Sequence, residues 1–233
     1  METDKKIIKS IAKLAWSGLT AIKEHELSKL KLKSNALRPI SCQEALSLKT
    51  GDVVCVENHV GVVVLVERSS LLMINPFQGS ANWGSEWHDH LPYLDESGHS
   101  YDVRTSADSF IDGKNNTEII EKSIGDGVHF FPAFKYCIEQ GVGWFLPAIG
   151  ELELFKDTTL LKRVNATLIK YHVDIIIPDK GSNIFWSSTD NKNDQDYYTS
   201  AYALSVAANG EVTTKIEQKG ERKKILPFYR YTF

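Results

Sequence analysis

Two stretches of the sequence carry polar and aromatic side chains at a density suited to ligand binding. The first runs from 83 to 93 and the second from 190 to 202. Carboxylate and amide groups supply hydrogen bonds there, and tyrosine and tryptophan rings supply flat contact area. The candidate ligand-binding residues are Trp83, Trp87, His88, Tyr93, Asp190, Asn191, Asp194, Asp196, Tyr197, Tyr198 and Tyr202. Ordinary loop packing and a solvated loop are the plainer interpretations of the two stretches.

Metal binding is a further interpretation of the same residues. His88 and His90 alternate, so a strand would point both to one face, but a zinc site also needs a third ligand from elsewhere. Oxygens after Asp190 could hold Ca²⁺, but Lys192 occupies a position where the EF-hand pattern requires an oxygen ligand. We therefore expect no metal and no cofactor, and recognition of a glycan or a protein instead.

A catalytic alternative rests on His59. The run Gly51-Asp52-Val53-Val54 followed by His59-Val60-Gly61 superficially resembles the histidine strand of NlpC/P60 peptidases, which pair a thiolate with that histidine. Cys42 lies too near in the sequence, and Cys55 falls in the same hairpin. A cysteine hydrolase using His59 and a cysteine thus stands as the alternative function.

Other conspicuous residues are better explained as scaffold. Trp144 and Trp186 lie in apolar strand contexts, which favours core packing. Glu151 falls early in a helix, where its carboxylate can accept backbone N–H groups. Arg230 lies between aromatic residues of the last strand, where we expect it to pair with a carboxylate or with loop carbonyls. Ser187-Ser188-Thr189 lacks the glycine-flanked turn that a serine nucleophile uses.

The elements that position these residues follow from hydrophobic spacing and turn signals. Strands are expected at 53–56, 60–66, 71–74, 184–187, 201–207, 212–216 and 225–233, with hairpin turns near Asn58 and at Asn209-Gly210. Helices are expected at 4–33, 116–122, 131–140 and 151–171, and 76–104 is expected to be a long irregular loop. Strands at both ends with helices between them predict an α+β fold.

The bulk composition is that of an ordinary globular protein. The chain has 233 residues, a formal net charge of -3 and 42% hydrophobic residues, so neither a nucleic-acid partner nor a membrane span is expected. Three cysteines do not make a disulfide framework, and we expect buried, reduced thiols. Glu2 and Asp4 precede any apolar run, which predicts that no secretory signal is present and that the chain is cytoplasmic.

Several blocks, taken in order, resemble a known family. They are Asp112-Gly113-Lys114, GWFLPAIGELELF (143–155), Val164-Asn165-Ala166-Thr167-Leu168, FWSST (185–189), Ala201-Tyr202-Ala203-Leu204 and Leu226-Pro227-Phe228-Tyr229-Arg230-Tyr231-Thr232-Phe233. Together they resemble DUF1566, a group of bacterial domains common in gut Bacteroidales, over roughly residues 45–233.

The resemblance implies a C-type lectin-like fold. Such a fold has a twisted, mostly antiparallel sheet with two flanking helices, paired first and last strands, and a long loop region. It also implies a surface or secreted protein that is adhesin-like and not an enzyme. The chain would then divide into an N-terminal amphipathic helix (1–34), a linker (35–44) and the DUF1566-like domain (45–233). The helix could dock on that domain or join subunits into a homo-oligomer.

Overall fold

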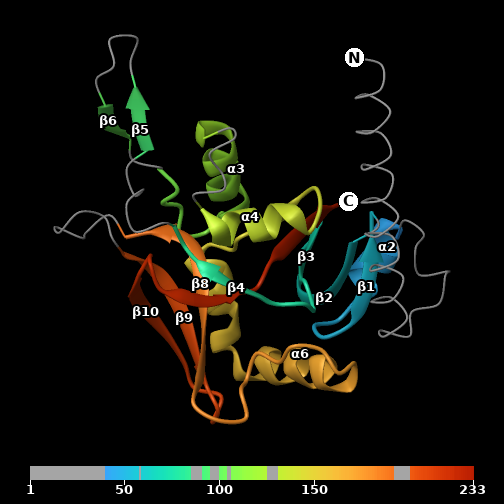
Figure 1. Ribbon diagram of the computed structural model, residues 1–233. Helices are drawn as coiled ribbons and strands as arrows, with labels where there is room; N and C mark the ends of the chain where they lie inside the picture. The colour runs from blue at the N-terminus through green and yellow to red at the C-terminus, as the bar shows by residue number, and fades with distance from the viewer. Residues whose placement is uncertain are drawn as a thin grey trace, which may run out of the picture.

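The protein has an α+β architecture, as the sequence predicts. The computed structural model describes residues 40–57, 59–84, 91–94, 100–103, 106–124, 131–191 and 200–233. In this part of the chain, two five-stranded sheets and a small hairpin are combined with short helices (Figure 1). The predicted helix at 4–33 lies outside the described residues.

The first sheet, sheet A, is antiparallel throughout and has the strand order β1–β2–β3–β12–β7. Its strands are β1 (Val53–Val56), β2 (His59–Val66), β3 (Ser70–Ile74), β7 (Trp144–Phe145) and β12 (Phe228–Thr232). The predicted hairpin around Asn58 is confirmed, because Val56 pairs with His59 across its turn.

The second sheet, sheet B, has the order β10–β9–β8–β11–β4, and its β8–β11 pair is parallel. Its strands are β4 (Gly79–Asn82), β8 (Ser182–Asp190), β9 (Ser200–Ala207), β10 (Val212–Gln218) and β11 (Arg222–Ile225). The predicted turn at Asn209-Gly210 joins β9 to β10, and Gly210 adopts the positive φ of 83° that such turns require. A separate antiparallel hairpin consists of β5 (Leu91–Leu94) and β6 (Ser100–Val103).

The helices lie at opposite ends of the sheets (Figure 1). They are α2 (Cys42–Ser47), α3 (Gly113–Ile124), α4 (Pro132–Glu139), α5 (Ile149–Leu152), a 3₁₀-helix η3 (Glu153–Lys156) and α6 (Thr158–Lys170). In the view of Figure 1, α3 and α4 lie toward the top, α6 lies at the bottom beside the lower part of sheet B, and α2 lies beside β1. The helices therefore cover the sheets from two sides.

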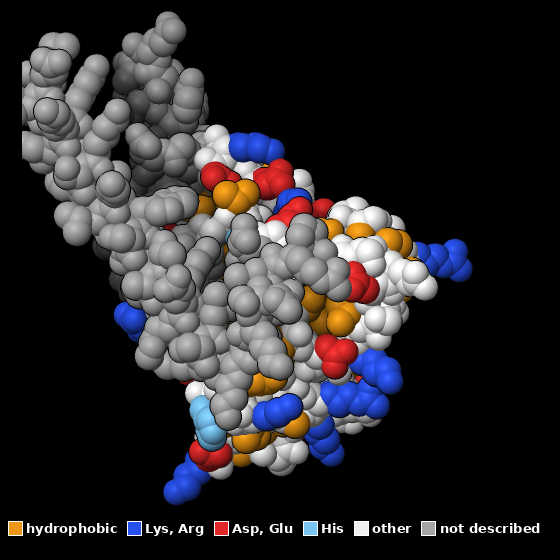
Figure 2. Space-filling view, turned by 90° about the vertical axis from the view of Figure 1, so that its right-hand side faces the viewer, with side chains coloured by type: hydrophobic (Ala, Val, Ile, Leu, Met, Phe, Trp, Pro, Cys, Tyr) orange, Lys and Arg blue, Asp and Glu red, His pale blue; other side chains and the backbone are white. Residues whose placement is uncertain are grey.

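The core divides into three apolar clusters. The largest lies between the two sheets and α6, and it includes Val64, Leu72, Phe145, Leu168, Phe185 and Phe228. A second joins the other face of sheet B to α3 and α4 through Trp83, Ile120, Phe134 and Trp186. The third lies on the other face of sheet A, around Met73, Trp144 and Tyr229. Seen from the side of α2 and β1, the coloured surface shows hydrophobic side chains in small areas between charged ones (Figure 2).

Several predicted boundaries are wrong, each for a local reason. The expected helix 151–171 is interrupted at Asp157, whose side chain accepts the N–H groups of Thr159 and Leu160 and so begins α6 anew. The expected strand 225–233 splits at Leu226-Pro227, where the chain passes from β11 in sheet B to β12 in sheet A. The stretch 76–104 is not wholly irregular, since it contains β4, β5 and β6.

Two further expectations are corrected near the start of the described chain. Ser41 and Glu44 form a capping box that begins α2 inside the predicted linker 35–44. Cys42 is exposed there, whereas Cys55 and Cys137 are buried as expected.

The first and last strands of the described chain share sheet A but are not neighbours. β12 pairs with β3 on one side and β7 on the other, and β1 pairs with β2. Short turns fold β1, β2 and β3 as a meander, and this places two strands between the ends that the C-type lectin-like expectation would pair directly.

Candidate functional site

Several of the sequence blocks that carry the family resemblance converge on one buried carboxylate, that of Glu151. Its Oε2 accepts the backbone N–H groups of Ala148 at 2.9 Å and Gly113 at 3.1 Å. Its Oε1 lies 3.2 Å from Nη2 of Arg230, and Nη1 of the same guanidinium lies 3.0 Å from the Glu67 carboxylate. The predicted roles of Glu151 as a backbone acceptor and of Arg230 as a carboxylate partner are therefore confirmed. One carboxylate ties α3, α5 and β12 together.

The glycine at the start of α3 is explained by the same contact. A Cβ on Gly113 would lie 2.4 Å from the Ala148 nitrogen and 2.6 Å from the Glu151 carboxylate. Such distances are far below van der Waals contact, so a larger residue would push α3 off the carboxylate. The glycine of the Asp112-Gly113-Lys114 block is thus a packing requirement.

The hydroxyl run at the end of β8 is part of the same scaffold. Ser187, Ser188 and Thr189 are all fully buried. The Ser188 hydroxyl contacts the Asn116 amide at 2.9 Å, and Thr189 accepts the Ile149 N–H at 3.0 Å. These groups satisfy buried polar atoms and are not exposed to a substrate, which agrees with their predicted structural role.

Burial sets the protonation behaviour of Glu151. Desolvation raises the pKa of this carboxyl above its ordinary value, although the Ala148 N–H, the Arg230 guanidinium and the Gly113 N–H all act in the opposite direction.

The raised pKa predicts a pH dependence of stability. An unfolded glutamate releases its proton near pH 4.3, whereas folded Glu151 keeps its proton to higher pH. In this window the native state binds more protons than the unfolded state, so the free energy of unfolding should fall as pH rises. Urea unfolding measured from about pH 4 upward should show a smaller fall in Glu151→Gln than in wild type. Parallel curves for the two proteins would contradict the assignment.

The two predicted ligand-binding stretches meet at a buried lysine that the sequence did not single out. The Lys219 ammonium lies 2.8 Å from the Asp190 carboxylate and 4.5 Å from the centre of the Trp83 ring. The Lys219 side chain is 2% exposed. Trp83 is fully buried, and its indole N–H donates to the Ser187 carbonyl at 2.7 Å. We call Trp83, Lys219 and Asp190 the Lys219 clamp.

The clamp corrects the role assigned to Trp83. With no exposed surface, this ring belongs to the core between sheet B and α4, where it packs on Phe131 and Phe134. It cannot stack on a ligand in this conformation. The clamp instead holds Trp83, which follows β4, close to Asp190 at the end of β8.

Asn191 likewise has a structural role, at the end of β8. It is 5% exposed, and its amide nitrogen lies 3.0 Å from the Ser200 hydroxyl. Its backbone N–H donates to the Ser200 carbonyl, which closes the ends of β8 and β9. Asn191 therefore links the end of β8 to the start of β9.

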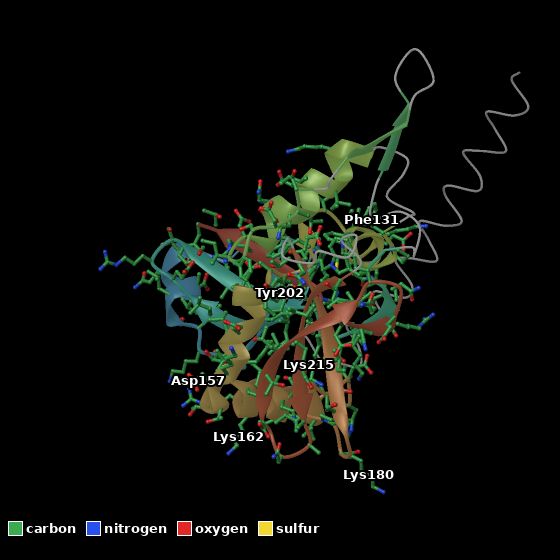
Figure 3. All side chains as sticks on the ribbon, turned by 90° about the vertical axis from the view of Figure 1, so that its left-hand side faces the viewer. Phe131, Asp157, Lys162, Lys180, Tyr202 and Lys215 are labelled. Carbon is green, nitrogen blue, oxygen red and sulfur yellow. The ribbon has the colours of Figure 1, made fainter. Side chains whose placement is uncertain are left out.

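Tyr202 lies beside an exposed apolar pair that sequence reasoning missed. Its ring meets that of Phe110 edge-on at 5.0 Å between centroids. Phe110 is 50% exposed and Ile111 is 79% exposed. We call Phe110, Ile111 and Tyr202 the Phe110 surface. Figure 3 marks Tyr202 on the side of the molecule that faces its viewer.

Hydrogen bonds fix the Phe110 surface next to the clamp. The Asp190 N–H donates to the Ala107 carbonyl, and the Gly150 N–H donates to the Phe110 carbonyl at 2.7 Å. A Cβ on Gly150 would lie 2.5 Å from that carbonyl oxygen, so glycine is needed for the close approach. Exposed aromatic and aliphatic side chains are thus held on a rigid backbone.

The remaining candidate residues cannot be placed as side chains. Tyr93 lies on β5, opposite Tyr101 of β6. Trp87, His88, Asp194, Asp196, Tyr197 and Tyr198 lie outside the described residues, as does His90. Within the described ranges, no three His, Cys, Asp or Glu side chains come together to hold a metal.

His59 is engaged in an aromatic cluster on sheet A. The Trp144 indole N–H donates to its Nδ1 at 3.0 Å, and its ring lies 4.6 Å from that of Tyr229. The Tyr229 hydroxyl donates to Glu57, and burial together with this bond raises the pKa of Tyr229 well above its ordinary value. Trp144 is buried, as predicted.

The pairing register argues against Cys55 as a nucleophile beside His59. Val56 pairs with His59 and Cys55 pairs with Val60. Paired residues share a face and successive residues alternate, so Cys55 and His59 point to opposite faces of the hairpin. A thiolate–imidazole pair between them is therefore excluded.

A cavity of about 430 Å³ opens elsewhere, between α3 and the chain that follows α4. Its lining combines an apolar floor with two lysines and two glutamates: Lys114, Thr117, Glu118, Glu121, Lys122, Ile138, Gly141, Val142, Gly143, Trp144 and Phe145. Lys122 and Glu118 pair with each other at 2.9 Å. The volume suits a small molecule, and the charges on its rim balance.

Comparison with known proteins leaves the family open. A scan against protein-family models gave no match, and a search of curated proteins found no relative. Among solved structures, the chain is similar to a fimbrial protein from Bacteroides ovatus ATCC 8483, with a TM-score of 0.48 and 18% sequence identity. The similarity covers 70% of this chain but 36% of the fimbrial protein. The resemblance to DUF1566 stays a prediction.

Proposed function

We propose that this protein is a non-enzymatic recognition module that binds a protein or a glycan at the end of sheet B. The observation that carries the proposal is the Lys219 clamp. By joining Trp83 to Asp190, it brings the beginnings of both predicted ligand-binding stretches to one place, beside the exposed Phe110 surface. Binding surfaces are commonly built in this way, with variable segments carried on a rigid frame.

The polar residues of the motif blocks support a binding role over a catalytic one. Glu151 is buried and bonded to backbone and to Arg230, and the hydroxyls of Ser187–Thr189 are enclosed. Glu151 could act as a general base and these hydroxyls as nucleophiles, but each of them is committed to holding elements together. A C-type lectin-like domain of the DUF1566 type is the fold and family that we propose for this arrangement.

The Phe110 surface favours a ligand with apolar area. Phe110 and Ile111 expose large side chains next to Tyr202, and contiguous exposed apolar groups typically mark interaction sites. Tyrosine and phenylalanine rings also stack on the apolar faces of sugars. The proposed ligand of this surface is therefore a glycan or a protein.

No helix in the described part of the chain is long and apolar enough to cross a membrane.

A binding screen with matched variants tests the proposal. Wild type, Ile111→Ser and Ile169→Ser are applied to arrays of glycans and of surface proteins. Ile169 is 54% exposed on α6, so the two substitutions remove equal apolar groups from different surfaces. Any ligand found should bind Ile111→Ser at least about fivefold more weakly, equivalent to ~1 kcal/mol, because exposed apolar contacts at an interface contribute at this level.

The control and a second variant make the outcome decisive. Ile169→Ser should bind like wild type. Tyr197→Ala/Tyr198→Ala alters the second predicted stretch and should also weaken binding. A ligand whose affinity is unchanged by both sets of substitutions would move the site away from the end of sheet B.

A further inference from the structure

β10 is an open edge of sheet B. It is the last strand in the order β10–β9–β8–β11–β4. Among the strands of the described residues it pairs with β9 alone, over all seven residues from Val212 to Gln218. Thr213, Thr214, Lys215 and Ile216 are all exposed, and Ile216 keeps 55% of its surface accessible. An exposed edge strand of this length is a template for pairing with another strand.

The phase of the β9–β10 ladder shows which backbone groups point outward. The Ala207 N–H donates to the Glu211 carbonyl, so odd-numbered residues of β10 bond to β9. In an antiparallel ladder, alternate residues bond to opposite sides. The N–H and C=O groups of Val212, Thr214 and Ile216 therefore face away from the sheet, and no backbone bond within the described ranges uses them.

We propose that β10 pairs with β10 of a second copy of this chain, antiparallel and centred on Ile216. Charge complementarity within the strand itself favours this partner. In this register Lys215 of each copy stands opposite Glu217 of the other, on the same face, which gives two cross-strand ion pairs. Lys215 is exposed and forms no ion pair with a described residue, while Glu217 already holds Lys223 at 2.8 Å.

The neighbouring registers are disfavoured by like charges. A ladder centred on Lys215 would set the two lysines against each other. A ladder centred on Thr214 would oppose Glu217 with Glu211. Like charges directly opposite one another destabilise a strand pair. The strand therefore specifies its own register.

Apolar contact reinforces the Ile216 register. Ile216 stands opposite Tyr202 on β9, and Tyr202 belongs to the Phe110 surface. Pairing the two Ile216 side chains joins the apolar surfaces of both copies across the two-fold axis. Figure 3 shows Lys215 and Tyr202 labelled on the side that faces its viewer, where the second copy would add its sheet.

The pairing would also make the molecule bivalent. Sheet B would become a continuous ten-stranded sheet with a Phe110 surface on each half. Two linked sites raise the apparent affinity for a repetitive ligand without any new contact. The dimer itself does not depend on the proposed recognition function, because its contacts are those of β10.

Cysteine cross-linking of the full chain tests the register directly. In a background of Cys42→Ser, which removes the exposed native thiol, Ile216→Cys would face itself across the two-fold axis. Hydrogen-bonded antiparallel partners lie about 5.5 Å apart at Cα, within the range that a disulfide spans. Oxidation should therefore yield a covalent dimer of twice the 26.2 kDa chain mass.

Thr214→Cys in the same background is the matched control. In the Ile216 register, the two Thr214→Cys positions are displaced from each other by four residues along the strands. This displacement is roughly 13 Å, which is too far for a disulfide. A dimer from Thr214→Cys but not from Ile216→Cys would overturn the register. No dimer from either variant would overturn the pairing.

Sedimentation of the chain with native cysteines measures the association itself. Wild type should form dimers as its concentration rises, and Lys215→Glu should raise the dimer Kd at least about tenfold, because it sets Glu against Glu217 twice. Lys162→Glu on α6 makes the same charge change away from β10 and should leave the Kd unchanged. A wild-type protein that stays monomeric, or a dimer insensitive to Lys215→Glu, would refute the proposal.

Discussion

Replacing Glu151 with alanine is expected to lower the free energy of unfolding by about 4 kcal/mol, since two buried N–H donors lose their acceptor and each such loss costs about 1–3 kcal/mol. The donors belong to Gly113 and Ala148, and the Arg230 guanidinium loses its buried partner in the same step. Urea unfolding followed by tryptophan fluorescence would measure the change.

Glu67→Ala provides the matched control for Glu151→Ala. Glu67 is the other carboxylate on Arg230, at 3.0 Å, but its side chain is 48% exposed. Exposed ion pairs contribute little, so this variant should lose under about 1 kcal/mol. If both variants lowered the free energy of unfolding equally, Glu151 would stabilise the fold by pairing with the Arg230 charge. Its bonds to the backbone N–H groups would then contribute little.

The sequence identified the scaffold well because its signals are local. The position of Glu151 early in α5 predicts a backbone acceptor, and the position of Arg230 in β12 predicts a carboxylate partner. Both roles are confirmed. Trp144 and Trp186 were likewise predicted to be buried from their apolar neighbours. What the sequence could not show is that Glu151 and Arg230 are partners, since 79 residues separate them.

The candidate site was harder to predict because burial is a tertiary property. Trp83 lies in a polar stretch typical of a surface loop, but the fold encloses it beneath Lys219 and beside Phe134. Nothing in the sequence indicates that Lys219 is buried, since an isolated lysine in a turn is normally solvated. A carboxylate and an aromatic ring from distant segments offset the cost of its burial.

The Phe110 surface was missed for a related reason. Phe110 and Ile111 precede Asp112-Gly113 in what reads as the approach to a helix. Their exposure follows from the Phe110 carbonyl, which accepts the Gly150 N–H, and from the Ser109 hydroxyl, which accepts the Asp112 N–H at 3.0 Å. These bonds fix the backbone, so the two apolar side chains remain on the surface.

Removing the carboxylate of Asp190 should have the second large effect, because the buried Lys219 charge then loses the carboxylate that lies 2.8 Å from it. The Lys219 side chain is 2% exposed, and breaking a buried ion pair from one side costs about 3–5 kcal/mol. The Trp83 ring retains its attraction for the ammonium, so we expect a loss of about 3 kcal/mol in Asp190→Ala. Thermal and urea unfolding would both report it.

A double variant separates the charge from the shape of the clamp. Asp190→Leu/Lys219→Met removes both charges at similar volume, and such replacements are often neutral or stabilising. It should therefore recover most of the stability lost in Asp190→Ala, whereas Glu118→Ala, which breaks an exposed pair with Lys122, should change little. A double variant as unstable as Asp190→Ala would mean that Asp190 supports β8 by its backbone geometry and not by its charge. If the double variant folds and still binds the ligand of the wild type, the clamp acts as a frame and the ligand is held by the segments that the frame carries.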